Sequence, residues 1–428
     1  MELKKYKLGE ILDVTRGTSL SGEFYAAKGE YVRLTCGNFD YQNNCFKENK
    51  AKDNLYYIGD FKSDFLMKEG DIITPLTEQA IGLLGSTAII PESGKYIQSQ
   101  DVAKIVCKEH LLDKDFAFYL ISSNLVKQQL SAAAQQTKIR HTSPDKIKDC
   151  IVWIPELEEQ KRIGKLLRTI DLKIELNRQL NHNLEAMTKQ LYDYWFVQFD
   201  FPDENGKPYK SSGGKMVWDK RLKREIPLLW KAKIVEEVAD VYNGATPSTV
   251  NELNYGGDIV WITPKDLSDQ KQKFVYQGER NISQVGYDSC STHLLPSNTI
   301  LMSSRAPIGL LAIAKTELCT NQGFKSFVSK SKNIATYLYY YLQYHITQIE
   351  QLGTGTTFKE VSREDILKFP MLKPSDNVLD LWEEIVSALN DRQLEIQKEN
   401  ENLTKQRDEL LPLLMNGQVS VNYDLSHD

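Results

Sequence analysis

The sequence predicts a mixed α/β protein made of two related globular halves and two long antiparallel coiled-coil helices, arranged as an internal pseudo-twofold repeat. Three observations support this prediction. Short stretches of the first half recur in the second at a nearly constant spacing, two acidic segments repeat apolar residues every seven positions, and each half contains short β-rich runs separated by Gly, Pro and Asn. The length of 428 residues also exceeds what one ordinary hydrophobic core accommodates.

The repeat spans the chain. Residues 10–17 match residues 237–244 at an offset of 227, and residues 29–35 match residues 257–263 at an offset of 228. Ile81-Gly82-Leu83-Leu84 recurs unchanged as Ile308-Gly309-Leu310-Leu311, and residues 143–147 match residues 362–366 at an offset of 219. Each match is weak alone, but their common order and nearly constant offset indicate a duplicated unit.

Two segments show the seven-residue spacing of coiled-coil helices. The positions expected at the helix-pair seam are Ile163, Ile170, Asn177, Leu184 and Leu191 in the first segment, and Trp382, Leu389, Ile396, Leu403 and Leu410 in the second, a shift of 219 at every step. Pro155 and Pro374 precede the two segments, where proline marks a helix start. Asn177 either fixes the register of the pair or is solvated where the helices splay apart; the sequence leaves both readings open.

Each globular half is expected to be mixed α/β. The predicted strands are Asp71–Thr74, Thr87–Ile90, Ala103–Cys107, Thr299–Ser303, Ala312–Ala314 and Ser326–Val328, and the predicted helical pieces lie near Phe116–Gln129 and Ile334–Gln351. A turn-rich stretch after residue 201 separates the halves. We therefore expect a first globular domain at 1–154, a long helix at 155–200, a linker at 201–230, a second globular domain at 231–375, and a long helix with a tail at 376–428.

The net charge of −5 is unevenly distributed. Residues 1–154 are neutral, residues 201–375 carry +4, and the two helical segments (155–200 and 376–428) together carry −9. This distribution permits a local nucleic-acid-binding face without demonstrating one. No apolar run reaches the ~20 residues of a membrane-spanning helix, and the six cysteines form no C-x-x-C pair, so we expect a cytoplasmic protein with no membrane partner.

The motifs of several enzyme classes are missing. The sequence has no Asn/Asp-Pro-Pro-aromatic motif, no phosphate-binding loop ending in Gly-Lys-Ser/Thr, and no H-E-x-x-H zinc motif. Glu159-Gln160-Lys161 has the local shape of a nuclease motif, but it lies at the start of a heptad helix, where a surface ion pair explains it better. We therefore expect no catalytic residue, no metal site and no cofactor in this chain.

Several stretches carry a resemblance to a known family. They are residues 195–202 (WFVQFDFP), 206–214 (GKPYKSSGG), 226–230 (IPLLW), 257–267 (GDIVWITPKDL) and 411–417 (LPLLMNG). Over essentially its whole length the chain resembles the specificity subunit of a type I restriction–modification enzyme. The resemblance implies two target-recognition domains that read an asymmetric bipartite site in double-stranded DNA, and two docked DNA-adenine methyltransferase subunits that use S-adenosylmethionine. Two restriction subunits, which use ATP and Mg²⁺, are further partners of the family, and the sequence leaves their presence here open.

The resemblance also indicates which residues contact DNA. In each half a polar, basic stretch precedes a Ser-initiated helix, and these stretches contain Thr137, Lys138, Arg140 and His141, and Thr356, Thr357 and Lys359. Ser304 and Arg305 are similar to a DNA-contacting loop of the family, although the first half has Thr77-Glu78-Gln79 there. Lys265 and Asn38 are weaker candidates. For both stretches a solvated loop capped by Ser143 or Ser362 is an equally good interpretation.

Two other hypotheses remain at this stage. A coiled-coil adaptor that binds only proteins would show no sequence-selective DNA affinity, and an undetected enzyme would need a cluster of reactive polar residues that the sequence does not show. Under the specificity-subunit hypothesis, a helix of about 40 residues is roughly 60 Å long, which suits two half-sites one to two turns of DNA apart.

Overall fold

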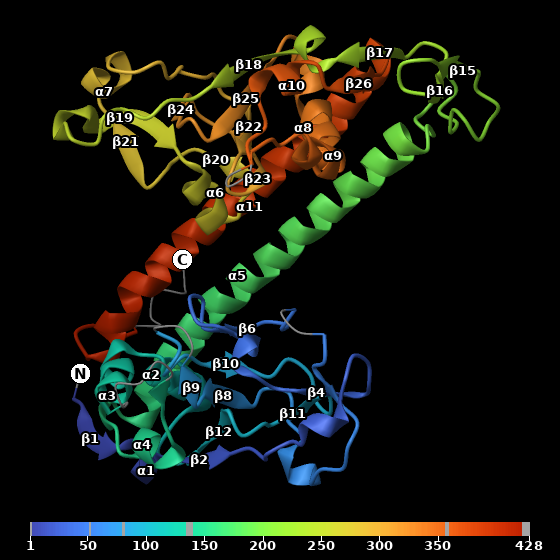
Figure 1. Cartoon of the computed structure of the whole chain (residues 1–428). Helices are drawn as coiled ribbons and strands as arrows, with labels where there is room; N and C mark the ends of the chain where they lie inside the picture. Colours follow the sequence, from blue (N-terminus) through green and yellow to red (C-terminus); the bar gives the residue numbers. More distant parts are fainter. Residues whose placement is uncertain (1, 51–52, 79–81, 134–139, 356–358, 422–428) are drawn as a thin grey trace, which may run out of the picture. The chain divides into compact units, whose positions relative to one another are not determined.

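The computed structural model describes residues 2–50, 53–78, 82–133, 140–355 and 359–421. The chain forms two compact units, Met1–Leu176 with Asn400–Asp428 (unit 1) and Asn177–Glu399 (unit 2). Each unit contains one globular α/β part together with one end of each long helix, α5 (Leu157–Tyr192) and α11 (Asp376–Met415) (Figure 1). The two long helices and the mixed α/β class predicted from the sequence are confirmed.

Unit 1 contains two four-stranded sheets, ordered β10-β8-β12-β2 and β11-β4-β7-β3, and three strand pairs, β1–β14, β13–β9 and β5–β6. Its strands are β1 (Lys4–Lys7), β2 (Leu12–Arg16), β3 (Tyr25–Ala26), β4 (Tyr31–Arg33), β5 (Phe39–Asp40), β6 (Cys45–Phe46), β7 (Tyr56–Tyr57), β8 (Ile72–Pro75), β9 (Thr77–Glu78), β10 (Ala88–Ile89), β11 (Tyr96–Ile97), β12 (Val102–Cys107), β13 (Arg140–His141) and β14 (Ile151–Ile154). Its short helices are α1 (Leu8–Ile11), α2 (Lys114–Ile121), α3 (Asn124–Ala133) and α4 (Pro144–Lys148).

Unit 2 contains a five-stranded sheet, β18-β25-β22-β23-β20, a three-stranded sheet, β21-β19-β24, and the pairs β15–β16 and β17–β26. Its strands are β15 (Met216–Asp219), β16 (Arg224–Pro227), β17 (Lys231–Ile234), β18 (Ala239–Asn243), β19 (Tyr255–Ile262), β20 (Phe274–Val275), β21 (Arg280–Ile282), β22 (Ile300–Ser304), β23 (Ile308–Ala314), β24 (Cys319–Thr320), β25 (Phe324–Ser329) and β26 (Pro370–Lys373). Its short helices are α6 (Pro264–Gln270), α7 (Gln284–Asp288), α8 (Ala335–Tyr344), α9 (Ile346–Gln351) and α10 (Arg363–Leu367).

The repeat seen in the sequence is also a repeat of topology and register. The strand order β10-β8-β12-β2 of unit 1 corresponds to β23-β22-β25-β18 of unit 2. In the first strand pair of each unit, Lys4 lies opposite Ile154 and Lys231 lies opposite Lys373, which are equivalent positions at the offsets of 227 and 219. Since a one-residue slip would turn every side chain to the other face of the strand, the shared register places equivalent side chains on equivalent faces.

The short helices differ from the expectation in one respect. Each predicted helical piece is two helices, α2 and α3 in unit 1 and α8 and α9 in unit 2. In unit 1 the break coincides with Ser122, whose hydroxyl donates to the carbonyl oxygens of Phe118 and Tyr119 at 3.1 and 3.2 Å. Hydroxyls that bond back to the helix in this way compete with its own ladder. In unit 2 the break lies at His345, whose φ of −96° and ψ of 12° depart from helical values.

In unit 2 the two long helices meet around an aromatic core. Trp382 of α11 is fully buried, with ring centroids 6.0 Å from Tyr192, 5.9 Å from Trp195 and 4.9 Å from Phe196. Tyr192 ends α5, and the two other rings lie in the π-helical turn Asp193–Val197 that follows. The buried aromatic area makes this cluster a large contribution to the stability of unit 2.

The seam combines apolar and polar contacts, and the two helices run antiparallel within each unit. None of the ten seam positions named above is exposed. Asn177 is 3% exposed and donates from Nδ2 to Oε2 of Glu399 at 2.8 Å, so it is not a solvated position between splayed helices. In unit 1, Ile163 and Leu167 of α5 share a buried cluster with Leu414 of α11.

A buried lysine joins the sheet of unit 2 to both long helices. The ammonium group of Lys273, which precedes β20, lies 2.9 Å from Oε2 of Glu185 on α5 and 2.7 Å from Oδ1 of Asn390 on α11. It also donates to the hydroxyl of Tyr340 on α8 at 2.6 Å. Burial lowers the pKa of Lys273 to about 8. Burial works against ionisation of Glu185 as well, but the adjacent ammonium outweighs it and holds the pKa of this carboxyl below its usual range.

Unit 1 also has an ion pair between the long helices that is joined by a tyrosine, but different residues form it. Arg407 of α11 donates to Asp171 of α5 at 2.9 Å, and the hydroxyl of Tyr119 on α2 donates to the other oxygen of Asp171 at 2.5 Å. In both units a tyrosine from the helices that cover the sheet therefore joins an ion pair at the long helices. Among the described residues, no helix combines the length and the apolar character needed to cross a membrane.

The Lys273 network makes a prediction about stability. Lys273→Met deprives the partly buried Glu185 carboxylate of its cation, and we expect the free energy of unfolding to fall by about 2–4 kcal/mol, near the lower end of the cost of breaking a buried ion pair. The double variant Lys273→Met/Glu185→Gln removes the stranded charge and should recover at least half of that loss. Tryptophan fluorescence during urea unfolding measures the effect, because five of the six tryptophans lie in unit 2.

The matched control is Lys330→Met, which removes an exposed lysine whose ammonium group lies 3.4 Å from Asp240. Exposed pairs contribute about 0–1 kcal/mol, so this variant should unfold almost as the unmodified protein does. Equal destabilisation of the single and double Lys273 variants would show that Lys273 and Glu185 do not act as a pair.

Candidate nucleic-acid interface

In unit 1 the loop that precedes α4 is fastened to the central sheet. The amide of Thr142 donates to the carbonyl of Leu76 at 2.9 Å, and β13 pairs with β9, with Arg140 opposite Glu78. The Arg140 guanidinium lies 3.6 Å from the Glu78 carboxylate, and the Thr77 hydroxyl lies 3.3 Å from Nδ1 of His141. Two of the predicted DNA contacts, Arg140 and His141, are thus held on the short strand β13, which pairs with β9.

The carboxylate of Glu78 connects the backbone at residues 82–83 to the strand β13. Its side chain is 5% exposed, and Oε1 accepts hydrogen bonds from the backbone amides of Gly82 at 2.7 Å and Leu83 at 3.1 Å. Its other carboxylate oxygen faces Arg140. The Glu78 carboxylate therefore joins the backbone at residues 82–83 to the guanidinium of Arg140.

In unit 2 the equivalent loop is fastened in the same way. The amide of Val361 donates to the carbonyl of Ser304 at 3.1 Å. Reciprocal backbone hydrogen bonds of 3.1 and 3.0 Å between Thr354 and Glu360 close the loop that carries Lys359. Sequence positions 142 and 361, and 76 and 304, are related by the repeat offsets of 219 and 228. Both loops therefore occupy the same place in their units.

The charges around the two loops are reversed. In unit 2 the acidic residue, Glu360, comes from the loop, and the basic residues come from the sheet. Its carboxylate lies 3.2 Å from the ammonium of Lys325 on β25 and 3.9 Å from the guanidinium of Arg305 at the end of β22. In unit 1 the loop supplies Arg140 and the sheet edge supplies Glu78. The two units thus present different chemical groups from one framework.

The remaining predicted contacts are placed as follows. Lys359 is exposed, whereas the side chain of Ser304 is buried and its hydroxyl faces Glu360 at 3.4 Å. Lys265 is exposed and pairs with Glu279 at 2.8 Å. Asn38 is 2% exposed, and its amide group bonds to Thr35 and to the carbonyl of Lys47, so it serves the turn and is not available to a ligand. Thr137, Lys138, Thr356 and Thr357 lie outside the described residues.

Sequence reasoning missed three residues of these clusters, Glu78, Lys325 and Glu360. One signal was present: Glu78 and Arg305 are equivalent at the offset of 227 and have opposite charges, which is expected when each pairs with a partner of the other sign. Ser143 and Ser362 do cap α4 and α10, accepting from the amides of Lys146 at 3.3 Å and Asp365 at 3.1 Å. Capping therefore accompanies the loops without excluding a second role for them.

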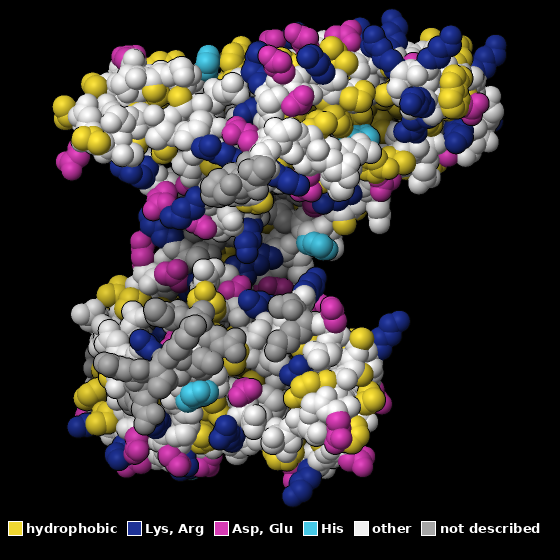
Figure 2. Space-filling model, in the orientation of Figure 1, with side chains coloured by type: hydrophobic (Ala, Val, Ile, Leu, Met, Phe, Trp, Pro, Cys, Tyr) yellow, Lys and Arg dark blue, Asp and Glu magenta, His cyan; other side chains and the backbone are white. Residues whose placement is uncertain are grey.

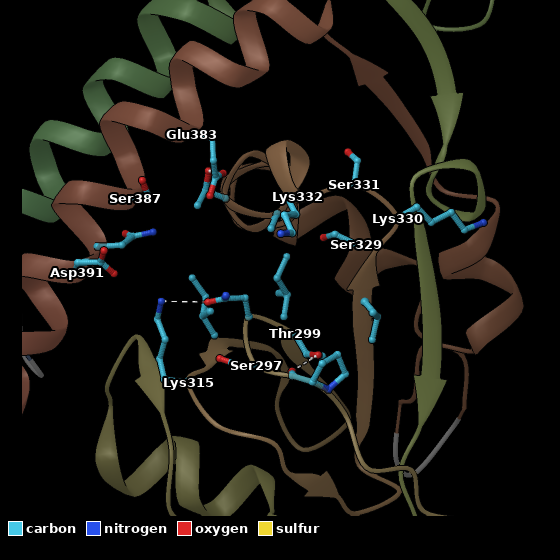
Figure 3. A pocket seen from close by; sticks show the side chains of 18 residues that line it. Ser297, Thr299, Lys315, Ser329, Lys330, Ser331, Lys332, Glu383, Ser387 and Asp391 are labelled. Carbon is cyan, nitrogen blue, oxygen red and sulfur yellow. Dashed lines mark hydrogen bonds between the residues drawn. The ribbon is translucent and has the colours of Figure 1, made fainter.

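A cavity of about 680 Å³ lies elsewhere in unit 2, between the ends of β22 and β25 and the helix α11. Figure 3 shows Glu383, Ser387 and Asp391 on the helix side, with Lys315 on a separate segment. Burial raises the pKa of Glu383, which accepts from the Thr336 hydroxyl at 2.6 Å, and burial lowers the pKa of Lys315. Among the described residues no group of three or more His, Cys, Asp or Glu side chains could hold a metal ion.

Comparisons with known proteins agree with this architecture. A family model described as the type I restriction modification DNA specificity domain matches residues 1–186 and 227–405. The type I restriction enzyme HindI specificity subunit of Haemophilus influenzae is 24% identical and is aligned over 97% of this chain and 99% of that protein. The MjaIX specificity subunit of Methanocaldococcus jannaschii is 35% identical, but that match covers 45% of this chain and 46% of the relative.

A solved structure shows the same fold. The crystal structure of a type I restriction–modification S subunit from M. genitalium superposes with a TM-score of 0.62, covering 97% of this chain and 96% of the other at 15% sequence identity. The family model covers both repeats, and each repeat builds the same α/β part with one loop at the same place. The chain therefore belongs to the DNA specificity subunits of type I restriction–modification systems, the non-catalytic members of these DNA-binding complexes.

Proposed function

We propose that each unit reads one half of an asymmetric, bipartite site in double-stranded DNA, through the loop that carries Arg140 in unit 1 and the loop that carries Lys359 in unit 2. The observation that carries this proposal is the pair of equivalent loop attachments, Thr142 to Leu76 and Val361 to Ser304, combined with reversed charges around them. Equivalent attachment gives both loops the same approach to DNA, and different side chains make them read different bases.

The side chains at these loops suit the two kinds of DNA contact. Arginine binds the O6 and N7 atoms of guanine with two hydrogen bonds, and lysine binds phosphate oxygens or the same guanine atoms. Arg140 and Arg305 are about one-third exposed. Arg140 is held by Glu78 and the Ser131 hydroxyl, and Arg305 is held by Glu360, so DNA can replace or share these partners. In our proposal Arg140 and His141 serve one half-site and Arg305 and Lys359 serve the other, with the rest of the two loops completing each contact.

The long helices supply the spacing and the docking surface in this proposal. The helices α5 and α11 contain 36 and 40 residues, and 40 residues extend roughly 60 Å. On α5, Leu172 and Leu176 are 53% and 61% exposed, one helical turn apart. Exposed leucines at this spacing suit an apolar helix of a partner, and two copies of the repeat suit two methyltransferase subunits. Each docked methyltransferase would use S-adenosylmethionine to methylate an adenine flipped out of the DNA stack.

The proposal makes a prediction about the methylation motif. Expressed with its cognate methyltransferase subunit, this chain should produce an asymmetric, bipartite adenine-methylation motif that the methyltransferase alone does not produce. Arg140→Ala should relax or abolish one half of the motif only, and Arg305→Ala with Lys359→Ala should affect only the other half. Losing a two-bond base contact costs about 1–3 kcal/mol, which is roughly a 5- to 150-fold loss of discrimination. Methylome sequencing of the host reads both halves at once.

Lys28→Ala, at an exposed lysine of unit 1 away from the loop, is the matched control and should leave both halves of the motif unchanged. If no motif depends on this chain although it still binds the methyltransferase, the chain is an adaptor and the reading proposal fails. If the motif appears but the loop variants alter both halves equally, the assignment of one loop to one half-site fails.

A further prediction tests docking. Leu172→Asp/Leu176→Asp places two charges on the exposed face of α5, and we expect binding to the methyltransferase subunit to weaken at least 100-fold, because an apolar contact is replaced by desolvated carboxylates. Co-purification and titration of the full-length chain with the methyltransferase measure the change. Lys173→Asp, on a neighbouring exposed face of the same helix, is the control and should bind nearly as the unmodified chain does. Equal binding by the leucine variant would place the docking surface elsewhere.

A further inference from the structure

A strongly basic segment lies between the two copies of the specificity domain. Residues 207–231, which we call the basic hairpin segment, contain eight Lys or Arg residues and two acidic residues, a net charge of +6 in a protein whose total is −5. The eight are Lys207, Lys210, Lys215, Lys220, Arg221, Lys223, Arg224 and Lys231, and all are exposed. Figure 2 shows Lys and Arg side chains gathered over this part of unit 2, whereas basic and acidic side chains are interspersed elsewhere on the visible face.

The basic hairpin segment is held firmly in unit 2. The strands β15 and β16 pair over four residues, from Met216 opposite Pro227 to Asp219 opposite Arg224. Beneath them the ring of Phe201 stacks between Tyr209 and Trp230, with centroid distances of 4.6 and 4.9 Å. The hydroxyl of Tyr209 also donates to the carbonyl of Lys215 at 2.8 Å. The cations are therefore presented on a rigid support, which lowers the entropy lost when they bind a ligand.

The acidic side chains around the segment accept hydrogen bonds within local turns of the chain. Asp219 accepts from the amides of Arg221 and Leu222 at 2.9 and 2.8 Å, and Asp200 accepts from the amide and hydroxyl of Ser211 at 2.7 and 2.6 Å. Within the described ranges none of the eight cations has a carboxylate within ion-pair distance. Asp200 and Glu237 interact electrostatically with Lys210 and Arg221 without forming ion pairs with them. An anionic partner would therefore gain from the remaining net positive charge of the segment.

We infer that the basic hairpin segment binds the phosphates of double-stranded DNA without regard to base sequence. Four residues of a strand extend about 13 Å at roughly 3.3 Å per residue, and each DNA strand carries one phosphate per about 3.4 Å of helix axis. The hairpin therefore spans about four phosphates of one strand. Such contacts fix a protein on the duplex and provide affinity, but they carry no sequence information.

Two observations favour DNA over an acidic protein surface as the partner. The tip of the hairpin, residues 220–224, carries four cations in five positions, a density that matches the phosphate backbone. The segment up to residue 226 also lies outside both matches to the specificity domain, so it has no counterpart in the other unit and adds a contact that neither recognition loop supplies. The inference is independent of which bases the two loops read.

The test neutralises the tip in the full-length chain bound to its methyltransferase. The variant is Lys220→Gln/Arg221→Gln/Lys223→Gln, which leaves Arg224 in place because its guanidinium lies 4.7 Å from the Phe199 ring centroid. The control is Lys271→Gln/Lys332→Gln/Lys368→Gln, three exposed lysines of the same unit. It is matched in backbone strain as well as in charge, because Lys271 and Lys223 have φ values of 52° and 51°. Binding is measured from 50 to 300 mM salt on equal-length duplexes with and without the methylated motif.

We expect the tip variant to lose at least tenfold in affinity for both duplexes at low salt, with a salt dependence less steep by about 0.9 for each phosphate contact removed. Its methylation motif should stay unchanged, and the control should bind as the unmodified complex does. Unchanged binding and slope would overturn the inference, as would equal losses in the tip variant and the control. Loss of methyltransferase association with DNA binding intact would assign the surface to a protein partner instead. A missing motif in the unmodified complex would count against the reading proposal, not against this one.

Discussion

The ammonium group of Lys273 sits where three helices, α5, α8 and α11, meet the sheet of unit 2, and it is accepted there by a carboxylate, a phenol and side-chain amides. A charge this well buried is stable only while every one of these partners is in place. It therefore fixes the sheet relative to its ends of the long helices, and everything that the sheet carries depends on it. In unit 1 the pair of Asp171 and Arg407, with Tyr119, meets the same requirement from other residues.

A protein that recognises an asymmetric site needs two recognition surfaces that share one backbone arrangement but carry different side chains. The backbone register, the loop attachments and the helix caps repeat between the units, so the position of each loop is set by features that both units share. The variable groups, Arg140 with Glu78 and Arg305 with Glu360, are confined to the ends of those attachments. The basic hairpin segment is not part of this repeat, because it occurs once in the chain and has no counterpart in unit 1.

Much of the fold could be predicted because it follows local patterns. The heptads predicted both long helices, and the offsets of 219 and 227 predicted the repeat. Five of the six predicted strands lie within two residues of their predicted bounds, and β23 begins four residues before its predicted start. Contacts between distant residues were not accessible in this way. Whether Asn177 was solvated depended on Glu399, more than two hundred residues away. The burial of Asn38, in contrast, follows from a local turn with Thr35 and Lys47 that the sequence pattern did not show. Glu360 became visible as part of the site only once Lys325 was placed beside it.

The reversed charges around the two loops limit how such a protein can acquire a new target. A loop transplanted alone from unit 1 into unit 2 would place Arg140 and His141 at positions 359 and 360, and would remove the carboxylate of Glu360 that Arg305 and Lys325 share. In the reverse transplant Lys359 would take the place of Arg140 opposite Glu78, and Glu360 would take the place of His141 opposite Thr77. A loop moved from unit 1 into unit 2 therefore leaves two basic side chains of the sheet without their carboxylate. Exchange of a whole globular part between relatives keeps each loop together with the sheet residues that pair with it. An exchange of a whole half is therefore more compatible with the ion pairs at the loops than an exchange of one loop.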